Sequence, residues 1–229
     1  MLIHFVLLRR LALFAVLAAC CGLAQAWPDR PVTLVVPFAA GGPTDTIARI
    51  LAERISRSLG QPVVVENIAG AGGTIANARV IKSAPDGYMV MIGHVGTHVL
   101  AQAVQGLNVD YVNDFDPVAM IATNPEVIMS RNGAPARNLQ ELVEWVKANP
   151  GKVSFASGGA GTPSHVMAAQ FSTIVAPLNI VHYRGSGPAM LDVVAGHVDL
   201  SFDQAATGLA FARSGQARAY AITSKSRIA

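Results

Sequence analysis

The sequence contains very little cysteine: the 229 residues include two, Cys20 and Cys21, and both lie within the first 26 residues. If this segment is removed during export, the remaining chain has no thiol. Disulfide bridges, thiol catalysis and cysteine-ligated metals are then excluded. A chain of this length can bury enough apolar surface to fold without disulfides, as one large domain or two small ones.

Charged residues are also few, at 14% of the chain. Two of the 17 basic residues, Arg9 and Arg10, lie in the first 26 residues, so the rest carries 15 basic and 14 acidic residues. This near-neutral balance argues against the basic surface with which proteins bind nucleic acid. We therefore expect no nucleic-acid partner.

Residues 1–26 are typical of a signal peptide. The two arginines precede the apolar run Leu11–Ala19, and Ala24-Gln25-Ala26 is a small-residue cleavage site. The alternative is cleavage before Cys20, which follows Leu17-Ala18-Ala19 as in a lipoprotein and would leave a lipid anchor on that cysteine.

The segment that follows predicts a β-α-β-α-β unit. Val32–Phe38 is an apolar, β-branched strand, and Thr44–Leu59 has apolar residues at helical spacing. Pro62–Glu66, Thr74–Lys82 and Tyr88–Ile92 continue as strand, helix and strand. Apolar strands that alternate with helices predict a parallel sheet covered on both faces.

The same order returns in the second half, after an extended apolar segment (118–130) and a helix (139–148). Its predicted elements are the strands Lys152–Ala156, Ile180–Tyr183 and Val198–Phe202 and the helices Pro163–Val175 and Pro188–Ala195. The predicted fold class is α/β with two facing domains, each a mostly parallel sheet flanked by helices. We expect hinges near residues 116–124 and 215–223.

In each half the first strand leads into a glycine-rich loop that opens a helix: Phe38–Asp45 and Ser157–Thr162. Unpaired N–H groups at a helix N-terminus bind anions, and glycine lets a ligand approach them. Such loops lie at the carboxyl ends of parallel strands, where ligands bind. The two loops therefore predict a site for a small carboxylate between the domains. Asp45 favours its helix and is also a candidate acceptor for a ligand. The alternative is that both loops are tight turns that bind nothing.

Other motifs are weaker. Neither loop has the Gly-Lys-[Ser/Thr] of a P-loop, and Gly70–Ala76 lacks the third glycine of a dinucleotide fingerprint, so we interpret it as a tight turn. We expect no cofactor. His94 and His98 have the spacing of a zinc-protease pair, but Gly96 should interrupt a helix, so no metal is expected. His94 and Thr97 are better candidates for lining a cleft.

No catalytic residues are predicted. Ser164 and His165 are neighbours on a helix, so their side chains point apart, and His165 more simply orients the loop. We interpret His182 as a core histidine and His197 as a surface one. Arg184, at a strand end, either pairs with an anionic ligand or with a surface carboxylate.

Several stretches together resemble the Bug family of extracytoplasmic solute receptors. They run through nearly the whole exported chain: "WPDRPVTLVVPFAAGGPTDTIARILAERISRSLGQPVVVENIAGAGGT", "PDGYMVMIG", "NPGKVSFASGGAGTPSH", "VHYRGSGPAMLDVVAGHVDLSFD" and "GQARAYAITSKSR". Each is modest alone, but their order and spacing are specific.

The resemblance implies a monomeric, two-domain periplasmic binding protein of the type II (Venus flytrap) class that holds a small organic acid. That ligand would be a mono-, di- or tricarboxylate or an acidic amino acid, delivered to the membrane subunits of a tripartite tricarboxylate transporter. The implied ligand-binding residues are Phe38, Ala39, Ala40, Gly41, Gly42, Thr44, Asp45, Thr97, Ser157, Gly158, Gly159, Thr162 and Asp203.

Members of this family continue beyond the position where this sequence stops, and their last segment completes the first domain. The expected division is therefore a signal peptide (1–26), an incomplete first domain (27–118), a second domain (119–220) and the start of a return hinge (221–229). We expect apolar surface and an unpaired sheet edge on the first domain. A ligand-sensing module for a signalling partner, or a periplasmic enzyme acting on a small acid, are the alternative functions.

Overall fold

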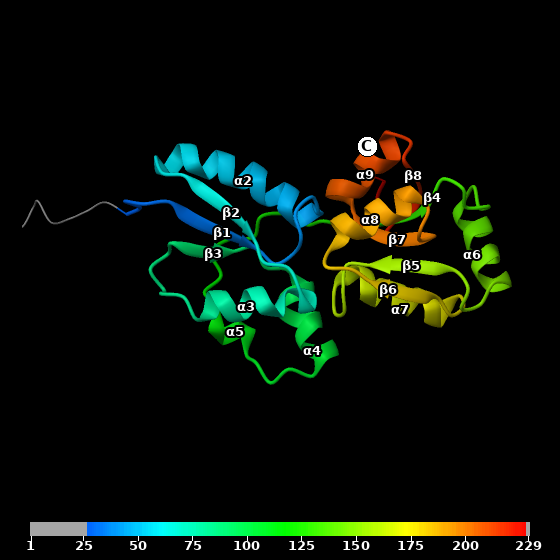
Figure 1. Cartoon of the computed structure of the whole chain (residues 1–229), viewed down its shortest axis with the longest axis horizontal. Helices are drawn as coiled ribbons and strands as arrows, with labels where there is room; N and C mark the ends of the chain where they lie inside the picture. Colours follow the sequence, from blue (N-terminus) through cyan, green and yellow to red (C-terminus); the bar gives the residue numbers. More distant parts are fainter. Residues whose placement is uncertain (1–26, 228–229) are drawn as a thin grey trace, which may run out of the picture.

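A computed structural model describes residues 27–227, which form two lobes, each built on its own sheet (Figure 1). The signal-peptide prediction falls on residues 1–26, outside the described part. The elements of the first lobe are β1 (Val32–Val36), α2 (Pro43–Leu59), β2 (Val63–Asn67), η1 (Ala71–Gly73), α3 (Thr74–Ile81), β3 (Met89–Met91), η2 (Gly96–Leu100), α4 (Ala101–Gln105) and α5 (Tyr111–Asp114).

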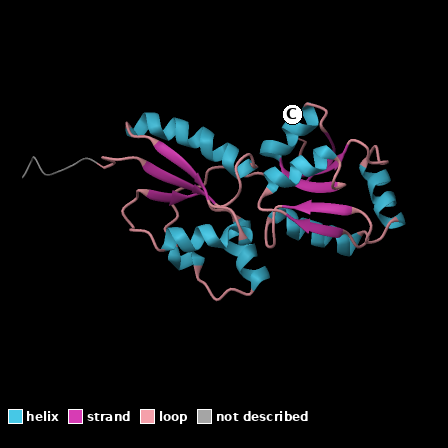
Figure 2. Ribbon diagram, in the orientation of Figure 1, coloured by secondary structure: helices cyan, strands magenta, loops and turns pink. Residues whose placement is uncertain are grey.

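The first lobe has a three-stranded parallel sheet with the order β2-β1-β3. β1 is central and almost fully buried, as its apolar sequence predicts. α2 lies on one face of the sheet and α3 on the other (Figures 1 and 2). The predicted unit of three strands and two crossover helices is confirmed here, with ends displaced by one or two residues.

The second lobe is larger. Its elements are β4 (Glu126–Arg131), α6 (Leu139–Ala148), β5 (Ser154–Ser157), α7 (Pro163–Ile174), β6 (Asn179–His182), α8 (Ser186–Ala195), β7 (Leu200–Gln204), α9 (Ala205–Arg213) and β8 (Ala217–Ile222). The strand order is β6-β5-β7-β4-β8. β5 pairs in parallel with β6 and β7, so this lobe repeats the arrangement of β1 between β2 and β3. The two predicted halves thus share one topology.

Two expectations about this lobe need correction. Residues 215–223 were expected to form a hinge, but they contain β8, which pairs antiparallel with β4. β4 is also antiparallel to β7, so the second sheet is mixed. Of the extended segment 118–130, residues 118–125 have no regular structure and lead from the first lobe into β4.

Two further differences concern histidines. A π-helical turn, η2, runs from Gly96 and continues into α4, so Gly96 begins a helix instead of interrupting one. His182 is exposed because β6 is an edge strand, so its interpretation as a core residue is wrong. His197 is exposed, as expected.

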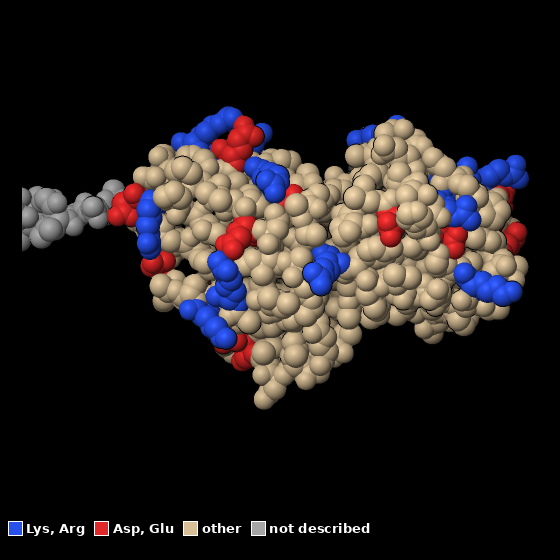
Figure 3. Space-filling model, viewed as in Figure 1, with Lys and Arg blue, Asp and Glu red and all other residues tan. Residues whose placement is uncertain are grey.

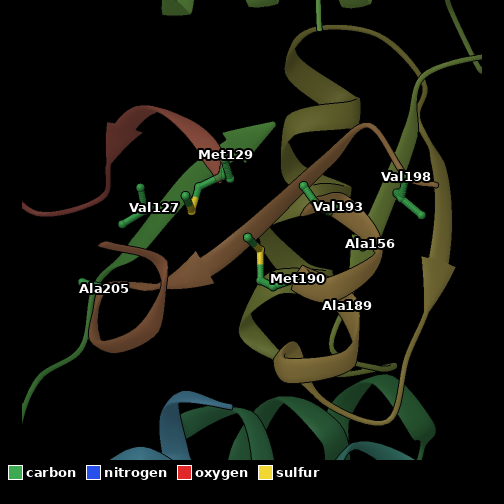
Figure 4. Close-up of a cluster of buried hydrophobic side chains, with 9 residues drawn as sticks. Val127, Met129, Ala156, Ala189, Met190, Val193, Val198 and Ala205 are labelled. Atoms are coloured by element: carbon green, nitrogen blue, oxygen red, sulfur yellow. The ribbon is translucent and has the colours of Figure 1, made fainter. Parts of the chain in front are cut away.

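The second lobe owes its stability to apolar clusters on both faces of its sheet. One cluster joins β4, β5 and β8 to α8, and it includes Met129, Met190 and Val193 (Figure 4). The other packs Phe155 and Phe202, whose ring centroids lie 5.6 Å apart, against α6 and α7. Burial of this kind stabilises by roughly 25 cal/mol per Å² of apolar area.

The first lobe has a thinner core, which centres on Leu34, Val36 and Ile92. Several of its apolar side chains are exposed, including Ile50 and Val64, and Val118 and Met120 in the connecting segment are 89% and 87% exposed. This matches the apolar surface expected there. We infer that the first lobe is the less stable of the two.

The charged side chains are scattered. On the face shown in Figure 3, lysines, arginines, aspartates and glutamates alternate along the outline, and no patch of one sign forms. Among the described residues, none of the helices has the length and apolar character needed to span a bilayer.

Candidate functional site

Three helices begin around one hollow between the lobes, which we call the central hollow. Its cavity volume is about 20 Å³, within about 350 Å³ of non-atom space that includes the opening to solvent. The described residues that line it are Phe38, Gly42, Pro43, Thr44, His94, Glu126, Gly158, Thr162, Pro163, Ser164, Ser186 and Gln204. They include the N-terminal residues of α2, α7 and α8. None of these lining residues is Lys or Arg, so the groups there that can attract an anion are the N–H groups at the helix N-termini.

Asp45 holds the first glycine-rich loop in shape. Its carboxylate accepts hydrogen bonds from the Gly41 N–H at 2.9 Å, from Arg49 Nε and Nη2 at 2.9 and 3.0 Å, and from Asn67 Nδ2 at 3.0 Å. Asn67 Nδ2 also donates to the Phe38 carbonyl at 3.0 Å. Gly41 has a φ of 82°, a conformation that favours glycine. Asp45 is buried behind the loop and supports its shape. Both of its carboxylate oxygens already accept hydrogen bonds within the protein, so neither is free to accept one from a ligand, which was the role that the sequence had suggested.

Hydroxyl groups hold the second loop. Ser164 Oγ accepts from the Gly158 N–H at 2.9 Å, and Thr162 Oγ1 donates to the Gly159 carbonyl at 2.7 Å. Ser157 Oγ lies 2.7 Å from His182 Nδ1. His165 Nδ1 accepts from the Gly161 N–H at 3.1 Å, which is the orienting role expected of this histidine. The loop is therefore fixed before any ligand arrives.

Replacing Ser164 by alanine should destabilise the protein by about 1–3 kcal/mol, because the buried Gly158 N–H loses its acceptor. Chemical denaturation would measure the change in free energy of unfolding. The matched control is Ser58→Ala on the exposed face of α2, for which we expect a change within about 0.5 kcal/mol. Equal effects of the two substitutions would contradict the support role of Ser164.

The lobes approach each other closely along glycine backbones. The Ala39 N–H donates to the Arg184 carbonyl at 3.1 Å, which links the first loop to the start of α8. A Cβ atom on Gly187 would lie 3.0 Å from the Ala40 carbonyl oxygen and 3.1 Å from the Gly42 nitrogen. Backbone from one lobe therefore packs directly on backbone from the other.

A second contact between the lobes involves the turn 70–73. A Cβ on Gly72 would lie 2.3 Å from the Ala160 carbonyl oxygen, and one on Gly161 would lie 2.5 Å from Ala101 Cα. The turn was expected to pack a helix on its own sheet, but it also packs on the second glycine-rich loop. Arg184 lines a neighbouring hollow between these segments.

His94 lines the central hollow and is a neutral donor. Its ring stacks on Phe38, with centroids 5.3 Å apart, and its Nδ1 accepts from the Gly96 N–H at 2.9 Å. Burial, with a smaller effect of His98, lowers the pKa of His94 to about 4. The hydrogen bond to Nδ1 assigns the proton to Nε2, which is then free to donate to a ligand.

Thr97 and Asp203 were expected to line the cleft, but both lie buried in the protein interior. Thr97 is fully buried behind His94, and its hydroxyl donates to the His94 carbonyl at 3.1 Å. Asp203 is also fully buried, and its Oδ2 accepts from the Thr207 hydroxyl at 2.7 Å. Of the described residues, these two do not line the central hollow. Four further expected ligand-binding residues belong to the two glycine-rich loops but do not line the central hollow: Ala39, Ala40, Gly41 and Gly159.

Glu126, which the sequence did not point to, lines the central hollow. It is 7% exposed, begins β4 and pairs across the ladder with Gln204. Its Oε2 has no hydrogen-bond partner among the described residues, and the same holds for Oδ1 of Asp203. Burial, reinforced by the charge of Asp203, raises the pKa of Glu126 to about 8. Burial also raises the pKa of Asp203 to about 7.

These two carboxyl groups should make stability depend on pH. Their unfolded pKa values are near 4, so the folded protein holds more protons than the unfolded chain between about pH 4 and 8. The free energy of unfolding should therefore fall with rising pH across this window, by several kcal/mol for the two groups together. Denaturation from pH 5 to 8 measures the slope, which Glu126→Gln should reduce. Glu144→Gln on α6 is the exposed control; an unchanged slope in Glu126→Gln would contradict the assignment.

Within residues 27–227, Ser164 and His165 are not arranged as a nucleophile and its base. The Ser164 hydroxyl and the His165 ring are engaged with different backbone N–H groups, so the triad that can be written from the sequence is not assembled. Among residues 27–227, no group of three or more His, Cys, Asp or Glu side chains is placed to hold a metal ion.

Comparison with known proteins identifies the family. Residues 47–229 match the model of the tripartite tricarboxylate transporter family receptor, TctC. The chain is 37% identical over 205 residues to an Agrobacterium vitis protein from the TAR-I ttuE–ttuC′ intergenic region, covering 89% of this chain and 59% of that protein. The chain therefore spans less than two thirds of the length of this relative.

Solved structures agree in fold. The periplasmic binding protein BugD superposes with a TM-score of 0.84 at 39% identity, covering 88% of this chain and 68% of BugD. MatC from Rhodopseudomonas palustris, solved with bound malate, superposes with a TM-score of 0.81 at 38% identity, covering 88% of this chain and 69% of MatC. These matches confirm the resemblance to the Bug proteins and the two-domain binding-protein fold. The chain belongs to the TctC family of tripartite tricarboxylate transporter receptors.

Proposed function

We propose that this protein is a periplasmic receptor that captures a small organic carboxylate in the central hollow and delivers it to a tripartite tricarboxylate-type membrane transporter. The observation that carries the proposal is the convergence of three helix N-termini on one hollow lined by no basic side chain. Main-chain N–H groups in this arrangement bind a carboxylate without a paired cation. The malate bound to the similar MatC supports the same ligand class.

The two lobes would close on the ligand. We propose that the segment 116–124, in the connection from α5 to β4, acts as a hinge, because it has no regular structure and is largely exposed. Closure brings α2 of the first lobe against α7 and α8 of the second, so each lobe contributes donors to one ligand. A ligand that contacts both lobes shifts the population toward the closed form. That form is the one we expect a transporter to recognise.

Ligand-dependent thermal denaturation tests the proposal. The panel contains malate, succinate, citrate, adipate and benzoate, with glucose as an uncharged control. At a concentration one hundred times the Kd, a ligand adds about 2.7 kcal/mol to the free energy of unfolding, which raises Tm by roughly 5–10 °C. A selective rise with one or more acids supports the receptor; a folded protein that responds to none of them contradicts it. Isothermal titration then gives the affinity directly.

A further inference from the structure

A buried acidic side chain lies on the wall of a hollow that otherwise suits anions. Glu126, the first residue of β4, lines the central hollow together with residues from the first turns of α2, α7 and α8. An ionised carboxylate at this position would repel the ligand carboxylate that the helix N-termini attract. The two features are compatible if Glu126 carries a proton while the ligand is bound.

The surroundings of Glu126 favour its protonated form. The residue is buried, and its Oε2 has no hydrogen-bond partner among the described residues, although buried carboxylates normally pair with a cation or accept several hydrogen bonds. Burial, reinforced by the charge of Asp203, outweighs a hydrogen bond with the Gln204 side chain and raises the pKa of Glu126 to about 8. At neutral pH the side chain is therefore mainly a neutral carboxylic acid, whose O–H group can donate a hydrogen bond.

The titratable groups on the surrounding elements do not supply a free positive charge to Glu126. On α2, Asp45 is paired with Arg49 behind the first loop. Burial lowers the pKa values of His94, ahead of η2, and of His165, on α7, so both rings are neutral at and above neutral pH. The hydroxyl groups that β8, α8 and α9 present here do not titrate: Thr223, Ser186 and Thr207.

Asp203 is the neighbour whose charge changes near neutral pH, because burial raises its pKa to about 7. In the ladder of β4 with β7, Glu126 pairs with Gln204, whereas Asp203 pairs with Val127. Successive strand residues point to opposite faces, so the side chain of Asp203 lies on the other face of the sheet from that of Glu126. Asp203 therefore adds negative potential without facing the ligand, and Glu126 is the acid that does.

We propose that Glu126 binds the ligand as a carboxylic acid, donating a hydrogen bond from its protonated carboxyl group to the ligand carboxylate, so that the ionised receptor takes up a proton when it binds an anion. The proton comes from the solvent and returns to it when the ligand leaves. This inference rests on the proposed function, because it needs a carboxylate in the central hollow. The neutral ring of His94 is a second side-chain donor, through Nε2, and neither donor adds a charge beside the ligand.

Isothermal titration of the unmodified protein between about pH 7 and 9.5 tests the proton uptake, with succinate, malate, adipate and benzoate as probes. The carboxyl groups of these acids stay ionised over this range, so a change in affinity reports on the protein. The affinity should fall by about tenfold or more as pH rises, because an ionised Glu126 must regain a proton before it can donate. At about pH 8.5, titrations in buffers of low and high ionisation enthalpy should show an uptake of roughly half to one proton per ligand.

Two substitutions separate the proton from the hydrogen bond. Glu126→Gln keeps a donor but does not titrate, so its affinity should stay within about threefold over the whole pH range and exceed that of the unmodified protein at about pH 9.5. Glu126→Met keeps a side chain of similar length without a donor, so it should bind about tenfold more weakly than Glu126→Gln. The control Glu144→Gln, on the exposed face of α6, should keep the pH dependence of the unmodified protein. Thermal denaturation without ligand checks that each variant is folded.

The titrations of the unmodified protein do not depend on the folding of any variant. An affinity that is constant with pH or rises with it, or a binding step without proton uptake, overturns the inference and leaves the carboxylate receptor intact. The same pH dependence in Glu126→Gln as in the unmodified protein overturns it too, because another group would then carry the proton. Equal affinities of Glu126→Gln and Glu126→Met overturn the donor role. A folded protein that binds none of the four acids at any pH overturns both proposals.

Discussion

Replacing Gly187 by valine is expected to weaken carboxylate binding by roughly tenfold or more, while the ligand-free protein keeps its fold. A Cβ at this position would lie 3.0 Å from the Ala40 oxygen, 3.1 Å from the Gly42 nitrogen and 3.2 Å from the Gly41 carbonyl carbon. All three atoms are backbone of the other lobe and belong to the first glycine-rich loop. The two methyl groups of valine extend further, so the lobes cannot reach the distance at which both loops contact one ligand.

The Gly187→Val substitution should affect only the closing of the two lobes on each other. Gly187 lies in the first turn of α8 and does not have a left-handed conformation, so valine introduces no backbone strain within its own lobe. Isothermal titration of the Gly187→Val variant measures the affinity, and thermal denaturation without ligand shows whether the fold is kept. The control is Gly133→Val, at an exposed turn where an added Cβ meets only the end of the flexible Arg131 side chain.

An affinity of Gly187→Val equal to that of the unmodified protein would mean that the lobes bind ligand without this close approach. A variant that loses binding together with its cooperative thermal transition would instead show that the contact is needed for folding. Because the second lobe has its own two-sided core, we expect it to fold in either case.

Much of the fold could be predicted because the pattern of apolar residues within a single segment determines whether it forms a helix or a strand. Helical spacing gave the helix 139–148 with the observed ends, and the apolar run at 32–38 gave β1, which ends two residues earlier, at Val36. The antiparallel neighbours β4 and β8 could not be predicted in the same way, since a strand's partner is set by tertiary packing and not by its own sequence. The segment 215–223 contains small and polar residues typical of a turn, and only its pairing with β4 makes it a strand.

The site was predicted in part for the same reason. A strand followed by glycines and a helix start is a local pattern, so the N-termini of α2 and α7 were both identified. The third, that of α8, begins at Ser186, two residues before the predicted start at Pro188, because Gly185 and Gly187 obscure the periodicity. Glu126 was not identified, because it is a single acidic residue within an apolar run of the sequence. Its orientation depends on the register of β4 with β7, although a lone buried acid in a strand is itself a usable pattern.

Replacing Asp45 by asparagine is expected to destabilise the protein by about 2–3 kcal/mol and to lower Tm by about 4–10 °C. The side chain is 4% exposed and accepts from the Gly41 N–H, from two Arg49 nitrogens and from Asn67. Asparagine has only one acceptor oxygen. Its NH₂ group would take the place of the other oxygen and would face N–H donors with which it cannot form a hydrogen bond. Arg49 is more than half exposed, so the ion pair itself contributes little, and most of the loss comes from the loop and from Asn67.

The pH dependence of stability distinguishes support of the first glycine-rich loop by Asp45 from a direct contact of Asp45 with the ligand. Burial alone would raise the pKa of Asp45, but the hydrogen bonds from Arg49, Gly41 and Asn67 outweigh it and hold the pKa below its ordinary value. The stabilisation from this carboxylate is therefore present above about pH 4 and is lost as pH falls below that. Asp45→Asn should show a shallower loss of stability in acid, whereas Asp116→Asn, at an exposed position of the connecting segment, should follow the unmodified protein.

A loop that loses this support should also bind less tightly, because the Gly42 and Thr44 backbone groups that face the hollow are no longer preorganised. The loss should apply to every carboxylate tested, since it lowers the population of the competent loop and does not alter its chemistry. If Asp45→Asn kept its Tm and changed only the ranking of ligands, Asp45 would contact the ligand directly. The four hydrogen bonds that its carboxylate already accepts argue for the uniform loss.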